Sequence, residues 1–221
     1  MHTTSLCFRS MPLAAALAAA LCGCTTKDER GDLVVTKMVR PTITSGVGIA
    51  CELNVTTSEL AFGSVDPAVA PTYLLGAVVE NRLVSNANST QGRLNTNDFQ
   101  VEQARVRYEF PDASFNPSIG EQTTPANGLI KVSGSGAVGV NVFPPGVITI
   151  LRGALGASVG TVRAKLRLEG KLLDGSSIKT SEYEYTVRVC NGCGTPAPRC
   201  VAPTPTPVSC APGQDSDVAC Q

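Results

Sequence analysis

The side chains of this chain that could do acid–base chemistry are almost all carboxylates. The only histidine is His2 and there is no tryptophan, so a reaction that needs imidazole as base or metal ligand lacks its usual group. Glu182 and Glu184 would project from one strand face about 7 Å apart, within the range of the paired carboxylates of glycosidases. A solvated strand face carries such pairs routinely, and the sequence favours that interpretation.

Two further patterns could bind a ligand. Asp215 and Asp217 offer oxygen atoms in a short polar segment, as calcium prefers, but the spacing is not that of an EF-hand and a solvated turn is favoured. The segment Ser133–Gly136 (SGSG) matches neither a nucleophile elbow with a usable base nor a phosphate-binding loop. We therefore predict no catalytic residue, no metal and no cofactor, and we expect that the protein is not an enzyme.

The N-terminal residues have the pattern of an export signal. Arg9 is followed by the uncharged apolar run Met11–Leu21, which is shorter than the ~20 residues that span a bilayer. Leu21-Cys22-Gly23-Cys24 resembles a bacterial lipobox, with glycine at −1 and the acceptor cysteine at +1. The resemblance implies cleavage before Cys24 and acylation of Cys24, and several acyl chains anchor a protein without a transmembrane helix. An ordinary secretory signal with an incidental cysteine is the alternative.

The lipobox also carries an expectation about location and partners. In Gram-negative lipoproteins an aspartate after the acceptor usually retains the protein at the inner membrane; here Thr25 follows, which implies lipid anchoring in the outer membrane with the leaflet left open. The 18 basic residues balance the 18 acidic ones, so no nucleic-acid partner is expected. Membrane lipid is the one partner implied, while an envelope protein or a glycan stays open.

The remaining cysteines indicate disulfides. Of nine cysteines, Cys7 and Cys22 leave with the signal and Cys24 is acylated, so an even number remains, which outside the cytoplasm predicts three bridges of unknown connectivity. These six are Cys51, Cys190, Cys193, Cys200, Cys210 and Cys220.

Five of the six disulfide candidates lie in a proline-rich tail that cannot build its own core. Cys190-Asn191-Gly192-Cys193 could be a redox motif or half of a zinc site. The prolines that follow do not open the helix that a redox motif needs, and no second knuckle or nearby histidine is present for zinc. Structural disulfides are the favoured interpretation; we expect a local Cys210–Cys220 bridge and at least one bridge from the tail to Cys51.

The segments that must position these residues alternate with the period of strands. Apolar and polar residues alternate over 105–110, 162–169 and 182–189, which predicts antiparallel sheets buried on one face. Asp174-Gly175 and Asn127-Gly128 have the composition of hairpin turns. The segment 146–155 suits either a short helix or a strand-to-strand crossover, and its β-branched residues also suit a strand. Further strands are expected at 33–39, 73–84, 128–132 and 139–143.

Together these patterns predict a mostly β fold. We expect an antiparallel immunoglobulin-like or fibronectin-like β-sandwich with one short helix or crossover and a disulfide-stapled irregular tail, with a small barrel as the alternative. The expected organisation is a signal peptide at 1–23, a lipid-anchored tether at 24–48, the β-sandwich domain at 49–189 and a Pro/Cys-rich tail at 190–221.

The chain also resembles a recurrent set of uncharacterised Gram-negative outer-membrane lipoproteins. The residues that carry the resemblance are Cys51-Glu52, the stretch from Val79 to Leu83 leading to Leu94–Asn97, the strand end at Val189–Cys193, and the tail from Cys210 to Cys220. It implies an exported, lipid-anchored, β-rich protein and transfers no catalytic residue. We expect a non-enzymatic binding, adhesion or structural module whose loops are the contact surfaces; the alternative is an accessory, glycan-processing envelope enzyme that uses carboxylates only.

Overall fold

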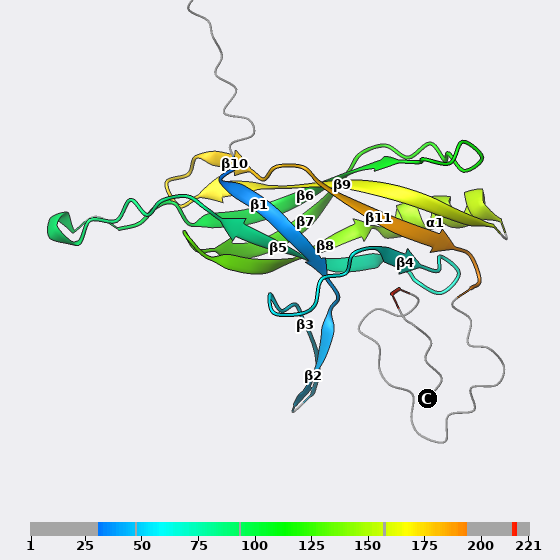
Figure 1. The fold of residues 1–221 in the computed structure, drawn as a ribbon, viewed down its shortest axis with the longest axis horizontal. Helices are drawn as coiled ribbons and strands as arrows, with labels where there is room; N and C mark the ends of the chain where they lie inside the picture. Colours follow the sequence, from blue (N-terminus) through cyan, green and yellow to red (C-terminus); the bar gives the residue numbers. More distant parts are fainter. Residues whose placement is uncertain (1–30, 47, 93, 157, 194–213, 216–221) are drawn as a thin grey trace, which may run out of the picture.

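A computed structural model describes residues 31–46, 48–92, 94–156, 158–193 and 214–215 (Figure 1). In these ranges the fold is mostly β with one short α-helix, as the sequence predicts. The strands are β1 (Leu33–Val39), β2 (Thr42–Gly46), β3 (Gly48–Glu52), β4 (Gly63–Val65), β5 (Tyr73–Asn81), β6 (Phe99–Glu109), β7 (Gln122–Ile130), β8 (Ser135–Phe143), β9 (Val159–Leu172), β10 (Ser177–Lys179) and β11 (Tyr183–Cys190). The helices are α1 (Pro145–Leu155) and a single 3₁₀ turn, η1 (Ser89–Gln91).

The larger sheet contains the strands with the clearest alternation in the sequence. Its order is β4-β11-β9-β6-β7, with β10 paired to β9 beside this path. Along β9 and β11 every second side chain is buried, and the same holds in β6 on either side of its bulge, which confirms the period-two prediction for these segments. All of its pairings are antiparallel except that of β11 with β4, which is parallel.

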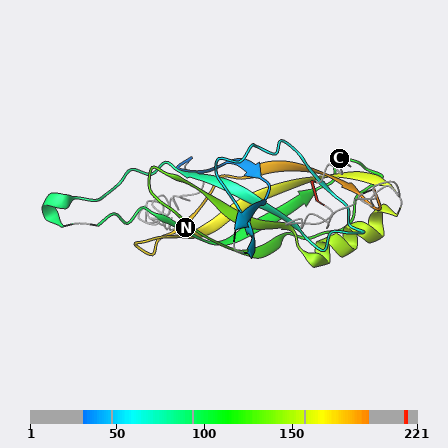
Figure 2. The same cartoon turned by 90° about the horizontal axis from the view of Figure 1, so that it is seen from below.

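The smaller sheet has the order β1-β5-β8, and β2 and β3 form a separate hairpin. Strand β5 is buried along nearly its whole length. Strands β7 and β8 pack side by side, so the two sheets meet at this edge and curl into a half-barrel around one core (Figures 1 and 2).

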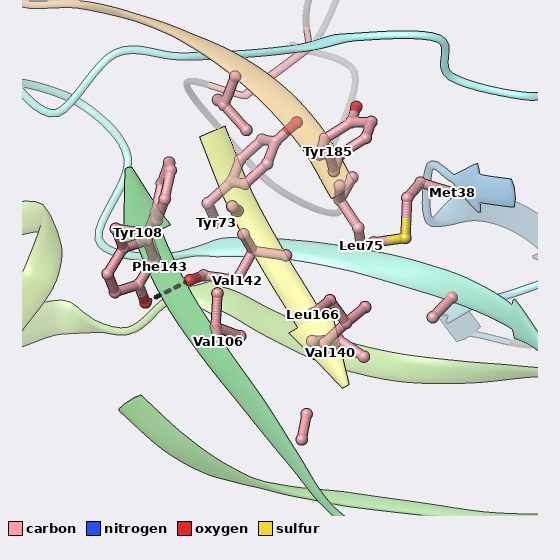
Figure 3. Close-up of a cluster of buried hydrophobic side chains, with 14 of the residues drawn as sticks. Met38, Tyr73, Leu75, Val106, Tyr108, Val140, Val142, Phe143, Leu166 and Tyr185 are labelled. Carbon is pink, nitrogen blue, oxygen red and sulfur yellow. Dashed lines mark hydrogen bonds between the residues drawn. The ribbon is translucent and has the colours of Figure 1, made fainter. Parts of the chain in front are cut away.

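The core lies inside the curl and draws side chains from both sheets. Figure 3 shows Tyr73 and Leu75 from β5 facing Leu166 of β9 and Tyr185 of β11. The buried Tyr108 hydroxyl donates a 2.8 Å hydrogen bond to the Val142 carbonyl, which joins β6 of one sheet to β8 of the other (Figure 3). This bond satisfies a polar group that would otherwise be costly to bury.

The segment 146–155, for which the sequence allowed a helix, a crossover or a strand, lies in helix α1. Pro145 occupies its first turn, where a missing N–H costs nothing, and Gly156 ends it with a positive φ of 55°. Val147, Ile148, Leu151 and Leu155 are buried on one side, so the three-and-four spacing decided the structure over the β-branched composition.

The two predicted hairpin turns have opposite outcomes. Asp174-Gly175 does form the turn before β10, with Gly175 at φ 86°. The prediction of a turn at Asn127-Gly128 is wrong: both residues lie inside β7, where Gly128 pairs with Val101 next to a bulge that places an extra residue in β7 opposite β6. A glycine in a strand interior often marks such a bulge rather than a chain reversal.

The strands also begin earlier than the expected domain start at 49, because β1 and β2 fall within 24–48.

Candidate functional site

The glutamate pair singled out from the sequence lies on the outer face of the larger sheet. Glu184 is in β11 and pairs with the Arg163 Nε at 2.8 Å, while Glu182, just before β11, pairs with the Arg107 Nη2 at 3.4 Å. Both carboxylates are partly exposed; the arginine that pairs with Glu184 is in the adjacent strand β9, and the one that pairs with Glu182 is in β6, on the far side of β9. The geometry is that of a charged, solvated strand face, and such exposed pairs contribute little to stability.

Other carboxylates on this face are held in their charged form. Lys165 donates a hydrogen bond to Glu109 and is the main cause of the lowered pKa of Glu109. Burial acts to raise the pKa of Glu169, but hydrogen bonds from Gln103 and Arg105 outweigh it and the pKa is lowered. A general acid near neutral pH needs a raised pKa, so neither glutamate is suited to that role.

The same face contains a hollow of about 390 Å³ at the bulge in β6. Glu102 and Glu169 both line it, together with Lys179 and Ile178. Glu102 accepts a 3.0 Å hydrogen bond from Lys171, and Glu169 is bound by Gln103 and Arg105. The hollow thus presents carboxylates that are paired with cationic side chains rather than a pair poised for proton transfer.

The longest connection of the described fold runs from β5 to β6 over residues 82–98, hereafter the 82–98 loop. It extends away from both sheets and carries η1 at its tip (Figures 1 and 2). Loops longer than ~12–15 residues are uncommon in compact domains and usually functional or mobile. Between its ends, residues 83–97 contain one charged residue, Arg93, among asparagine, serine, threonine and small residues.

Asparagine side chains hold the 82–98 loop in shape. At its base, the buried Asn81 donates to the carbonyls of Asn97 and Ile130 at 2.9 and 3.2 Å. Farther out, the Asn86 side chain donates to the Thr96 hydroxyl and accepts from the Thr96 N–H, both at 2.8 Å. These side-chain bonds replace the backbone ladder of a hairpin, so the loop is preorganised without being a β-hairpin.

The 82–98 loop presents apolar groups to solvent. Val84 is 80% exposed and Leu94 is 82% exposed, the highest values among the exposed large hydrophobic residues of the described chain. Two aliphatic side chains among amides and hydroxyls make a surface that can bury apolar area and form neutral hydrogen bonds with a partner. The sequence motif at 79–83 and 94–97 coincides with this loop, but only the structure shows that it projects.

A second polar cluster lies where the described end of the chain meets the sheets. Gln214 is 6% exposed and Asp215 is 8% exposed, and Gln214 forms an isolated antiparallel bridge with Val65 of β4. The Tyr73 hydroxyl donates to the Asp215 Oδ1 at 2.9 Å. Burial raises the pKa of Asp215, and burial likewise raises the pKa of Tyr73. The solvated turn expected at Asp215 is therefore wrong, and no sequence signal marks this burial; Asp217 lies outside the described residues.

One disulfide is present in the described part of the chain, between a pair that the sequence left open. Cys190 and Cys193 are bonded to each other at the end of β11. The turn between them is fixed by the buried Asp66, whose Oδ1 accepts a 2.8 Å hydrogen bond from the Gly192 N–H. For Cys51 only the backbone, in β3, is described, and Cys200, Cys210 and Cys220 lie outside the described residues, as does the lipidation candidate Cys24. Their pairing and acylation stay predictions.

The described residues bring together no group of three or more histidine, cysteine, aspartate or glutamate side chains that could hold a metal ion. Within the same ranges, none of the helices has the length and apolar character needed to cross a bilayer. Comparison of the chain with protein-family models, curated proteins and solved structures finds no match.

Proposed function

We propose that the protein is a lipid-anchored component of the outer membrane that acts as a non-enzymatic binding, adhesion or structural module. The lipobox ending in Cys24 supports the anchor. The observation that carries the binding role is the 82–98 loop, which is long, held by its own asparagine side chains and exposes Val84 and Leu94. Rigid loops on a β scaffold are a common way to build a contact surface.

The alternative of a glycan-processing enzyme requires two carboxyl groups with separated pKa values facing one pocket. Glu102 and Glu169 share a hollow, yet each is hydrogen-bonded to a cationic or amide side chain, and the pKa of Glu169 is lowered. This favours the binding module over the enzyme.

A second proposal assigns the half-barrel to a more specific fold class. We propose that the curled sheets are a variant of the immunoglobulin-like sandwich, supported by two mainly antiparallel sheets that enclose one core and are joined by the Tyr108–Val142 hydrogen bond. The parallel β4–β11 pair departs from that class.

The anchor is tested by replacing Cys24 with alanine in cells. The Cys24→Ala variant should lose acyl labelling and move to the soluble fraction. Cys22→Ala is the matched control, because it changes the neighbouring cysteine and leaves the acceptor in place. Acyl labelling of the Cys24→Ala variant would refute the assignment.

The binding role is tested by placing a photoreactive amino acid at Val84 or Leu94 in the intact envelope. A discrete crosslinked product is expected from these positions and not from Leu129, which is 53% exposed but lies in β7. Equal crosslinking from all three positions, or none, would contradict a contact surface on the 82–98 loop.

A further inference from the structure

The half-barrel has a seam where two strands face each other without pairing. Strand β4 is the last strand of the larger sheet. Strand β1 pairs with β5 only from Gly76 onward, so the first residues of β5, from Tyr73 to Leu75, have β8 on one side and no strand of the described fold on the other. Backbone groups on both sides of this seam therefore need partners from elsewhere.

Gln214 satisfies the β5 side of the seam with its side chain. The Leu74 N–H donates to the Gln214 Oε1 at 2.9 Å, and the Gln214 Nε2 donates to the Leu74 carbonyl at 2.6 Å. The carboxamide thus imitates the peptide group of a neighbouring strand. A carboxamide presents a donor and an acceptor side by side as a peptide group does, whereas the ionised glutamate of the same size has acceptors only and would leave the Leu74 carbonyl without a partner.

Asp215 satisfies the β4 side with both its backbone and its side chain. Its N–H donates to the Ser64 carbonyl at 2.8 Å, and its Oδ1 accepts from the Ser64 N–H at 2.7 Å. The Tyr73 hydroxyl donates to the same Oδ1, and Arg40 donates to the Asp215 carbonyl at 2.9 Å.

Gly63 makes room for this arrangement. A Cβ atom at Gly63 would lie 1.9 Å from the Tyr73 hydroxyl oxygen, so no other residue there leaves that hydroxyl in place to reach Asp215. The buried Oδ2 of Asp215 has no hydrogen-bond partner among the described residues, so only one oxygen of this carboxyl group is satisfied in the pocket.

We propose that the seam between β4 and the start of β5 is a peptide-binding site that recognises a Gln–Asp dipeptide whose aspartate has a positive φ, here 45°, and that Gln214–Asp215 of the same chain is its ligand. The contacts imitate strand addition: the Asp215 N–H donates to the Ser64 carbonyl through the backbone, and the Gln214 and Asp215 side chains supply the other bonds that a neighbouring strand would make. Residues 194–213 separate the dipeptide from Cys193, so it reaches the seam as a remote segment and not as the continuation of a neighbouring strand.

The test uses the full-length chain and a labelled peptide with the sequence of residues 211–218, Ala-Pro-Gly-Gln-Asp-Ser-Asp-Val. In the Gln214→Ala/Asp215→Ala double variant, the Ser64 and Leu74 amides should exchange hydrogen at least tenfold faster than in the unchanged chain. The labelled peptide should bind the double variant and restore their protection. A peptide with glutamate in place of the glutamine should bind about tenfold more weakly or worse, because the Leu74 carbonyl loses its donor.

Asp217→Ala is the matched control, since it removes the other acidic residue of the segment and should leave both amides protected. If the double variant loses its far-UV circular-dichroism spectrum, the single variant Gln214→Ala replaces it with the same expected exchange at Leu74, because the Leu74 N–H loses its acceptor. Equal protection of Ser64 and Leu74 in variant and unchanged chain would overturn the proposal. So would rapid exchange that the peptide does not reverse.

Discussion

Gly170 of β9 is the position where one added methyl group should damage the fold most directly. It pairs with Val101 beside the bulge in β6, and a Cβ there would lie 2.0 Å from the Gln100 carbonyl oxygen and 3.0 Å from the Val101 Cα. Contacts of a Cβ atom below 3.0 Å are essentially never seen, so β6 must move by about 1 Å. The obstacle is backbone, and no side-chain rotation relieves it.

Overpacking of this kind costs about 1–3 kcal/mol, and the backbone clash places Gly170→Ala near 3 kcal/mol. For a chain of this size, the cost corresponds to a fall of about 6–12 °C in the thermal midpoint. The measurement is chemical or thermal denaturation of the unchanged chain and the variant, followed by circular dichroism.

Gly153→Ala is the control, because it should raise the free energy of unfolding where Gly170→Ala lowers it. Gly153 is in α1 and no heavy atom lies within 4 Å of its Cβ position, so alanine should raise the stability by about 0.5–1 kcal/mol. A Gly170→Ala variant within about 0.5 kcal/mol of the unchanged chain would refute the β6–β9 register described above.

The remaining predictions concern the core, the seam and the cysteines. Tyr108→Phe should lower the free energy of unfolding by about 1–2 kcal/mol in urea denaturation, because the Val142 carbonyl loses its donor; an unchanged midpoint would contradict the inter-sheet bond. Since the pKa of Asp215 is raised above 3.8, its burial is favourable when protonated and becomes costly as the pH rises through that pKa. The thermal midpoint of the unchanged chain relative to Asp215→Asn should therefore fall from acidic to neutral pH, and a constant difference would argue against the buried carboxyl group. Alkylation of the unfolded, unreduced mature protein should label no cysteine, and bound zinc with free thiols after chelation would reverse the disulfide assignment. Replacing Cys210 and Cys220 with serine should leave the far-UV spectrum intact and increase proteolysis near the C-terminus; cooperative unfolding of the whole domain would show that the tail is part of the core.

Local patterns in the sequence were enough to predict most strands, and they allowed the helix as one of three alternatives. The alternation over 162–169 depends only on consecutive side chains pointing to opposite faces, and that geometry is the same in any sheet that is buried on one side. The spacing of Val147, Ile148, Leu151 and Leu155 is equally local, because it reflects the 3.6-residue turn. The cysteine count and the lipobox likewise need no fold to be read; acylation of Cys24 and the partners of the four disulfide candidates other than Cys190 and Cys193 stay predictions.

Tertiary structure alone decided which segments meet. The pairing of β4 with β11 in parallel joins residues that are far apart in the chain, and the three residues of β4 carry no pattern of their own. The projection of the 82–98 loop depends on the buried Asn81 contacting Ile130, another distant residue. The segment around Asp215 has the composition of a solvated turn, yet Asp215 is buried because Ser64 and Tyr73 offer it hydrogen-bond donors across the seam. Such contacts depend on how the sheets curl. They join residues that are distant in the chain, so the sequence around one residue does not identify its partner.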